Sequence, residues 1–172
     1  AMLMLDEITQ SVELTKEMRV LDLGCGKGLT SVFLAKEYGV QTFAVDLWIT
    51  ATDNYKRFLQ MGVDDLVIPI HADATVELPF ADEYFDALIS VDSYHYYGNS
   101  DDYFEKHLKS LIKKGAPVAI AIPGTKQEMN GIIPDELKPF LDDEGFATLH
   151  CIDWWTKILE KHLDDFFIKE MD

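Results

Sequence analysis

Short apolar segments alternate along the chain with segments of helical periodicity, and this alternation limits the fold more than any other feature. The apolar segments cover 19–23, 40–45, 66–70, 85–91 and 118–122, with a sixth candidate at 165–169, and Pro69 favours an edge position for the third. Amphipathic patterns predict helices over 3–14, 29–38, 51–61, 100–114, 134–141 and 153–163, with Ser100 and Asp153 as caps. Strands that alternate with helices form parallel sheets covered on both faces. We therefore predict an α/β fold, a Rossmann-like doubly wound and mostly parallel sheet of order 3-2-1-4-5 with a C-terminal edge strand.

The composition fits one folded domain and excludes several classes of partner. Apolar residues make up 48% of the 172 residues and charged residues 27%, so we treat 1–172 as a single globular domain. The formal net charge of -16 repels nucleic acid and anionic membranes, and the longest apolar runs are far short of the ~18 residues that span a bilayer. Because the two cysteines lack the spacing of a zinc site or a disulfide framework, we predict a cytoplasmic protein without a metal site.

The loop GCGKG joins the first predicted strand to the helix that follows it. Glycines there let the backbone turn tightly and approach a ligand, and the start of the helix directs free amides at that ligand. A dinucleotide site requires G-x-G-x-x-G, whereas this loop has G-x-G-x-G and carries Asp22 two residues ahead of Gly24. An acid at that position favours a cationic ligand such as S-adenosylmethionine, whose ammonium group the Asp22 carboxylate could hold directly or through water.

Acidic motifs follow in order along the predicted strands. Asp22 opens D-x-G-x-G-x-G in the first loop, Asp46 ends the second strand in AVDLW, and Asp73 precedes the fourth strand in HADAT. With these motifs the chain, from Arg19 to about Lys169, resembles the class I S-adenosylmethionine-dependent methyltransferases.

The resemblance assigns a role to each motif. It implies that the glycine loop contacts the methionine part of the cofactor and that the loop after the fourth strand faces methionine and the acceptor. It also implies that Asp46 binds both ribose hydroxyls, which a carboxylate can accept, while Asp73 binds the adenine amine. The cofactor-binding residues expected on this basis are Asp22, Gly24, Cys25, Gly26, Gly28, Asp46, Leu47, Trp48, Asp73, Ala74, Ser90 and Asp92.

The candidate catalytic residues, His95 and Tyr94, lie in SVDSYHYYG after the fourth predicted strand. His95 is a candidate general base for an acceptor hydroxyl or amine, and a polar wall of the acceptor pocket is the alternative. Tyr94 either shapes the acceptor cavity or packs in the core. Cys25 is either a thiol activated by the helix start or a small packing residue, and packing is favoured. Trp48 is a candidate to cover the cofactor.

The predicted function is methyl transfer from S-adenosylmethionine to a small-molecule acceptor by in-line displacement of the neutral thioether. VDSYHYY lacks the N/D-P-P-Y/F stretch of nucleic acid amino-methyltransferases, which also argues against DNA or RNA. A module that binds the cofactor without turnover and a nicotinamide-dependent oxidoreductase are the alternatives. Family members usually have a longer N-terminal segment and a final antiparallel strand pair. A domain truncated at both ends is therefore a further alternative. Its unpaired sixth strand would favour a homodimer.

Overall fold

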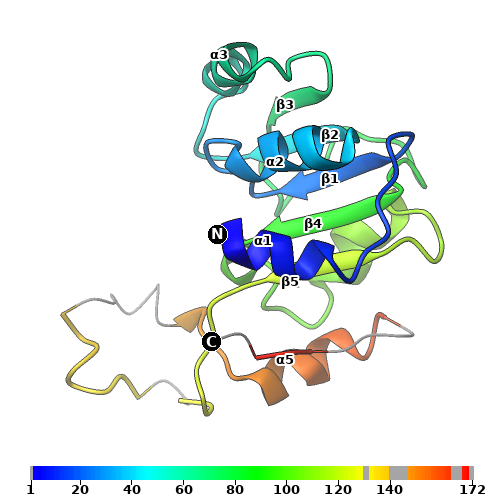
Figure 1. The fold of residues 1–172 in the computed structure, drawn as a ribbon. Helices are drawn as coiled ribbons and strands as arrows, with labels where there is room; N and C mark the ends of the chain where they lie inside the picture. The colour runs from blue at the N-terminus through cyan, green and yellow to red at the C-terminus, as the bar shows by residue number, and fades with distance from the viewer. Residues whose placement is uncertain (1, 130–131, 140–146, 164–167, 171–172) are drawn as a thin grey trace.

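The centre of the fold is a five-stranded parallel sheet of order β3-β2-β1-β4-β5 (Figure 1). The computed structural model describes residues 2–129, 132–139, 147–163 and 168–170. The strands are β1 (Arg19–Leu23), β2 (Gln41–Asp46), β3 (Val67–His71), β4 (Ala87–Val91) and β5 (Val118–Ala121). The predicted fold class and strand order are confirmed. Pro69 lies on β3, an edge strand, where a residue without an N–H is tolerated.

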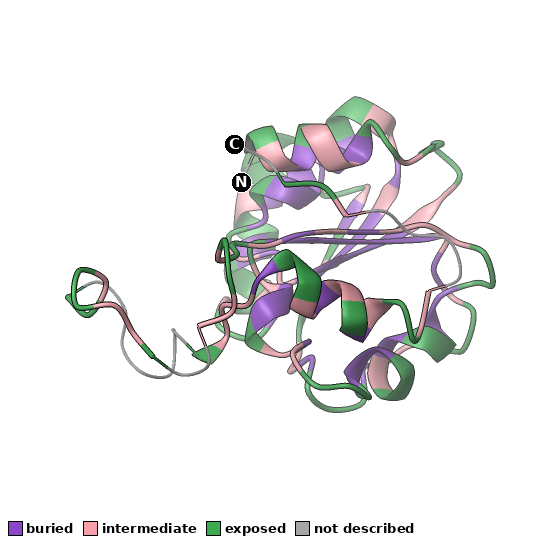
Figure 2. Ribbon diagram, turned by 90° about the horizontal axis from the view of Figure 1, so that it is seen from below, coloured by how far each residue is buried: buried purple, intermediate pink, exposed green. Residues whose placement is uncertain are grey.

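Helices cover both faces of the sheet (Figure 2). They are α1 (Met2–Thr9), α2 (Leu29–Tyr38), α3 (Ala51–Met61), the short helix η1 (Tyr94–Tyr96), the π-helix η2 (Phe104–Leu108), the 3-10 helix η3 (Lys109–Leu111) and α5 (Ile152–Leu159). Neighbouring residues of β1 point to opposite faces, as the alternation of a strand requires. Val20 packs in one core cluster with Leu5 of α1, whereas Leu21 shares another with Leu108 of η2 and Trp155 of α5.

The segment between β4 and β5 differs from its prediction, because no regular α-helix spans 100–114. The described chain forms the π-helix η2 and the 3-10 helix η3 there, and the Ser100 hydroxyl donates to the Asp102 side chain instead of capping a helix. The helical stretch ends because Ile112 is extended and bridges Phe85 in parallel. Phe85 was predicted to start the fourth strand, but β4 begins at Ala87 and Phe85 forms an isolated bridge.

The C-terminal third also departs from the pattern. The prediction that Asp153 caps its helix is wrong, because the N-cap of α5 is Cys151 and Asp153 lies in the first turn. Residue 134 is irregular and residues 135–139 form turns, and the rest of the helix predicted over 134–141 lies outside the described residues. The strand predicted over 165–169 lies mostly outside them too, and residues 168–170 are not in a strand. The helix expected over 3–14 ends at Thr9. None of the helices among the described residues is long and apolar enough to cross a membrane.

Candidate functional site at the carboxyl edge of the sheet

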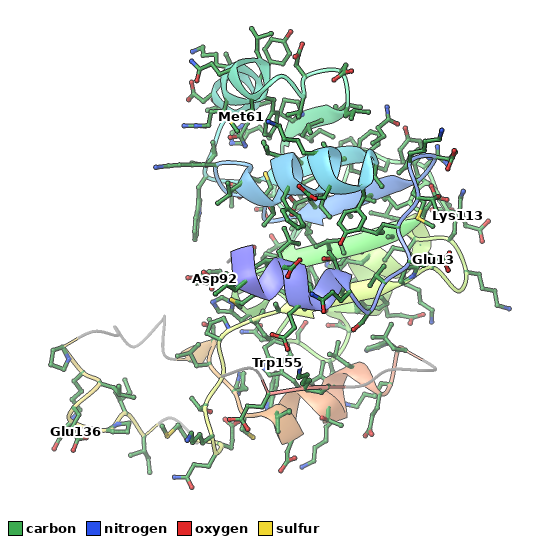
Figure 3. The ribbon with its side chains drawn as sticks, viewed as in Figure 1. Glu13, Met61, Asp92, Lys113, Glu136 and Trp155 are labelled. Atoms are coloured by element: carbon green, nitrogen blue, oxygen red, sulfur yellow. The ribbon has the colours of Figure 1, made fainter. Side chains whose placement is uncertain are left out.

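The predicted site residues follow the carboxyl ends of parallel strands, so most of them lie at one edge of the sheet. Figure 3 shows Asp92, which follows β4, at this edge, whereas Lys113 lies at the opposite end of the sheet. Ligands of open parallel sheets bind at this edge, near the point where the strand order reverses. In this chain that point lies between β1 and β4, the first strands of the two halves of the sheet.

The glycine loop between β1 and α2 needs its glycines for two different reasons. Gly24, Gly26 and Gly28 all have positive φ angles, of 75°, 55° and 79°. A Cβ atom on Gly24 would lie 1.7 Å from the Ser93 hydroxyl oxygen, and one on Gly28 would lie 2.3 Å from the Phe58 ring. Among the described residues, no heavy atom lies within 4 Å of the corresponding position on Gly26. The first and third glycines therefore permit close packing, while the second leaves an open surface for a ligand.

Asp22 lies in the interior beneath this loop, with only 1% of its surface exposed. One carboxylate oxygen, Oδ2, accepts hydrogen bonds from the Thr30 and Ser31 hydroxyls of α2, each at 2.5 Å. The other oxygen, Oδ1, is buried and has no hydrogen-bond partner in the described part of the chain. Burial raises the pKa of Asp22 to about 6, although the two hydroxyl hydrogen bonds oppose this shift. An unpartnered buried carboxylate oxygen fits a cationic ligand group placed against it.

Asp46 ends β2 and organises the backbone around it. Its Oδ2 accepts the amide of Gly26 at 2.8 Å, and its Oδ1 accepts the amides of Trp48 and Ile49, also at 2.8 Å. An ionised carboxylate has about four acceptor positions, so these amides leave about one position for a ligand hydroxyl. A second ribose hydroxyl would have to replace one of the three amides. After burial, the negative charge of the Asp46 carboxylate is a smaller cause of the raised pKa of Asp22.

Asp73 is more exposed than the other two acids and is bound locally. Its Oδ1 accepts the amide of Thr75 at 2.8 Å and the Thr75 hydroxyl at 2.7 Å, and these hydrogen bonds lower the pKa of Asp73. The neighbouring Ala74 is buried, and its carbonyl accepts a hydrogen bond from the Tyr103 hydroxyl at 2.7 Å. The structure therefore holds Asp73 by its own turn, separately from the bonded network around Asp46.

The segment after β4 contributes both buried and exposed groups. The Ser90 hydroxyl donates to the Leu23 carbonyl at 2.9 Å and so ties the ends of β4 and β1 together. Asp92 is exposed and has a positive φ of 56°, an uncommon conformation for a residue with a side chain. Tyr94 is 1% exposed and packs edge-on against the Tyr97 ring, which favours the packing alternative for this residue. Burial also raises the pKa of its hydroxyl.

His95 lies beside the exposed aromatic residues of the site. It is 2% exposed, its ring lies 4.0 Å from that of Tyr96, and its Nδ1 has no hydrogen-bond partner among the described residues. Burial lowers the pKa of His95, with the Asp92 carboxylate opposing, so the neutral imidazole is favoured at neutral pH. A neutral imidazole can accept a proton, so this environment is compatible with the general-base hypothesis.

Exposed apolar side chains adjoin Asp46. Leu47 is 49% exposed and Trp48 is 74% exposed, and the Trp48 ring contacts the Tyr96 ring edge-on at 5.6 Å. Contiguous exposed apolar side chains, such as this pair with Tyr96, often mark a surface that contacts a ligand or partner. Their surface lies next to the carboxylate that was expected to bind ribose, where a flat heterocycle would be placed.

Cys25 packs between helices. It is 7% exposed, belongs to the core cluster with Val32 of α2 and Phe58 of α3, and its sulfur accepts the Asn54 amide at 3.6 Å. Burial raises the pKa of the thiol, with the Asp22 and Asp46 carboxylates adding to the shift. This environment favours a packing role, since reactive thiols have lowered pKa values.

Both thiols should therefore resist modification in the folded protein. Cys25 and Cys151 are free and buried, so titration with an aromatic disulfide reagent at pH 8 should show no fast-reacting thiol in buffer and two per chain in denaturant. A thiol that reacts within seconds in the native protein would instead assign Cys25 or Cys151 to an accessible, activated site.

Two surface cavities lie away from the three acids. One of about 300 Å³ lies between residues 126–128 and the start of α5, and one of about 330 Å³ lies between residues 77–82 and the η2–η3 segment. Both are lined by side chains of both charge signs. Neither cavity is lined by Asp22, Asp46 or Asp73, so they are not part of the predicted cofactor site.

A five-stranded parallel sheet with a glycine loop after β1 and acids at the ends of β1 and β2 defines a Rossmann-like cofactor-binding protein. The model of the family described as "Methyltransferase domain" matches residues 20–115. The chain belongs to this family, and the resemblance to class I S-adenosylmethionine-dependent methyltransferases is confirmed.

Curated relatives and solved structures agree with this family. The chain is 27% identical over 131 residues to a glycine/sarcosine/dimethylglycine N-methyltransferase of Actinopolyspora halophila, covering 76% of this chain and 22% of that protein. It is 23% identical over 159 residues to the methyltransferase GfsG of Streptomyces halstedii, covering 92% and 56%. A SAM-dependent methyltransferase from Aquifex aeolicus has the same fold, with a TM-score of 0.69, 21% identity and coverage of 91% and 77%. The chain thus covers about a fifth of the length of the first curated relative and little more than half of the second.

Proposed function

We propose that the protein binds S-adenosylmethionine at the carboxyl edge of the sheet and transfers its methyl group to a small molecule. The observation that carries this proposal is the buried, unpartnered Oδ1 of Asp22 beneath a glycine loop in a chain of the methyltransferase family. We name residues 24–28 the donor loop and residues 92–97 the acceptor loop, after the substrate that each would contact.

Each site residue is proposed to bind a different part of the cofactor. Asp22 would accept the ammonium group, because a cation beside Oδ1 relieves the cost of a buried and unpaired carboxylate oxygen. Asp46 would accept one ribose hydroxyl at its remaining acceptor position and the other at the position that one displaced amide vacates. Leu47 and Trp48 offer apolar surface to adenine, and Asp73 is proposed to accept its amine. The open position at Gly26 would let the methionine part approach the backbone.

The reaction requires alignment more than acid–base strength. Bound S-adenosylmethionine supplies a methyl group on a sulfonium, whose departing thioether is neutral. The chain would therefore hold the acceptor in line with that methyl group and exclude water. His95, neutral and beside Asp92, is the residue that we propose to remove a proton from an acceptor hydroxyl or ammonium, with a purely polar wall as the alternative.

The acceptor is proposed to be a small organic molecule. The names of the relatives indicate small acceptors: glycine, sarcosine and dimethylglycine, a hydroquinone and norajmaline among curated proteins, and geranyl diphosphate in a solved structure with 14% identity. The formal net charge of -16 opposes binding to nucleic acid. A single domain, a cytoplasmic location and a homodimer formed through the C-terminal segment remain predictions from the sequence.

Calorimetry followed by a product assay tests the proposal. Titration with S-adenosylmethionine should give one site per chain with a Kd of roughly 1–100 μM, within the range of substrate constants of ordinary enzymes. S-adenosylhomocysteine should then accumulate with at least one of sarcosine, phosphoethanolamine, a methylated hydroquinone or geranyl diphosphate. Binding without product with any acceptor would favour the cofactor-binding module. Saturable NADH binding in place of S-adenosylmethionine binding would establish the oxidoreductase alternative.

A further inference from the structure

The hydroxyl of Tyr97 lies where the donor and acceptor loops meet. It receives a hydrogen bond from the Ser93 hydroxyl at 3.0 Å and donates to the Leu23 carbonyl at 3.3 Å. The Ser90 hydroxyl lies 3.5 Å from it and donates to the same carbonyl at 2.9 Å. Leu23 is the last residue of β1 and directly precedes Gly24. One phenol thus joins β1, β4 and the acceptor loop.

The contact between the two loops is tight on the glycine side. A Cβ atom on Gly24 would lie 1.7 Å from the Ser93 hydroxyl oxygen and 3.2 Å from the Tyr97 hydroxyl. The absence of a side chain at Gly24 is therefore what allows Ser93 and Tyr97 to approach the donor loop. A shift of the Ser93 hydroxyl toward Gly24 would press the acceptor loop against the first glycine of the donor loop.

The Tyr97 hydroxyl is fixed as a neutral donor. Burial raises the pKa of Tyr97 to about 12, the hydrogen bonds of Ser90 and Ser93 oppose this, and the Asp22 and Asp46 carboxylates add to it. A phenol with this pKa keeps its proton at neutral pH and is a poor general base. Its ring packs against those of Tyr94 and Tyr103, with centroids 5.8 Å and 5.4 Å away, so the side chain has little freedom to swing into solvent.

We propose that Tyr97 is a positioning residue, which sets the distance between the donor loop and the acceptor loop through Ser93 and the Leu23 carbonyl and touches neither substrate. This inference rests on the proposed methyl transfer. In-line transfer is sensitive to displacement, because an error of about 1 Å in placing the reacting groups can cost about a hundredfold in rate. The phenol would therefore act on the rate of transfer more than on the binding of either substrate.

Tyr97→Phe tests this inference, because it removes the hydroxyl and keeps the ring. With the panel acceptor that reacts fastest, kcat should fall about 10- to 100-fold, while the Kd for S-adenosylmethionine and the KM for the acceptor change less than about threefold. Tyr84→Phe is the matched control, since Tyr84 packs with Phe80 and Arg19 at the amino end of β1, and it should retain the wild-type kcat. A Tyr97→Phe enzyme with full kcat overturns the proposal. So does a parallel loss of cofactor affinity, which would place Tyr97 in the donor site itself.

Ser93→Ala provides a second variant. Ser93 and Tyr97 act through one hydrogen bond, so the double variant should be no slower than Tyr97→Phe alone. Additive losses would mean that the two residues act independently and would contradict the coupling. Thermal melts of each variant show whether it is folded at the assay temperature.

Amide hydrogen exchange tests the inference without a methyl acceptor. The amides of Gly24 and Cys25 both bond to the Val45 carbonyl, and the amide of Gly98 bonds to the Tyr94 carbonyl. In Tyr97→Phe these amides should exchange about tenfold faster than in wild type, and in Tyr84→Phe they should not. Unchanged exchange at all three amides overturns the proposal. If wild type forms no S-adenosylhomocysteine, the proposed function fails and exchange alone decides the role of Tyr97.

Discussion

Asp46→Ala should weaken S-adenosylmethionine binding by about a hundredfold or more. The substitution removes the acceptor for ribose hydroxyls, and hydrogen bonds to charged groups contribute about 1.5–3 kcal/mol each. It also releases the amides of Gly26, Trp48 and Ile49, which the carboxylate holds in place. Two effects on one site together exceed the roughly 2.7 kcal/mol that corresponds to a hundredfold change in Kd.

Calorimetry with matched variants separates these two effects. Asp46→Asn keeps the shape and one carbonyl acceptor, so its loss should be intermediate. Asp65→Ala is the control, because Asp65 is an exposed acid near the opposite end of β3 and should leave the Kd unchanged. Binding by Asp46→Ala within threefold of wild type would contradict the ribose assignment, and the thermal midpoint would show whether the backbone around residue 46 had been disturbed.

Local periodicity was sufficient to predict most of the sheet and its first helices. The helix 29–38 and the helix 51–61 have the predicted bounds, because apolar residues at helical spacing and a glycine just after the last residue are both local signals. The failures depend on distant partners. The segment 100–114 ends its helical part where Ile112 pairs with Phe85, and α5 starts at Cys151, whose amide bonds the Glu128 carboxylate. A local sequence pattern indicates neither Phe85 nor Glu128 as a partner, because each is more than 20 residues away along the chain.

The candidate site was predictable in its residue types and less so in its interactions. The motifs pointed to Asp22 and Asp46 because strand ends meet at one edge of a parallel sheet. They did not indicate that the Thr30 and Ser31 hydroxyls share one oxygen of Asp22, although hydroxyls in the first turn of the following helix were a signal for it. The role of the Tyr97 hydroxyl requires distances across three segments, and no sequence spacing reports these.

The proton on Asp22 should couple the stability of the protein to pH. Its pKa is about 6 in the folded protein, against an ordinary value of 3.8, so the folded state binds more protons than the unfolded chain between these values. The free energy of unfolding should therefore decrease as pH rises from about 4 to about 6, by about 3 kcal/mol from this group. Chemical denaturation of wild type and Asp22→Asn across this range measures the contribution, which the asparagine variant should lack.

Cofactor binding should reverse this penalty, because a cation beside Oδ1 favours the ionised form of Asp22. The affinity for S-adenosylmethionine should be constant above pH 6 and fall by up to about tenfold for each pH unit below it, with a proton released on binding. S-adenosylhomocysteine shares the ammonium group and should show the same slope, while Asp22→Asn should bind both more weakly and without the slope. If the slope persists in Asp22→Asn, another group titrates and Asp22 does not face the ammonium. A slope for S-adenosylmethionine alone would place the sulfonium, instead of the ammonium, beside Asp22.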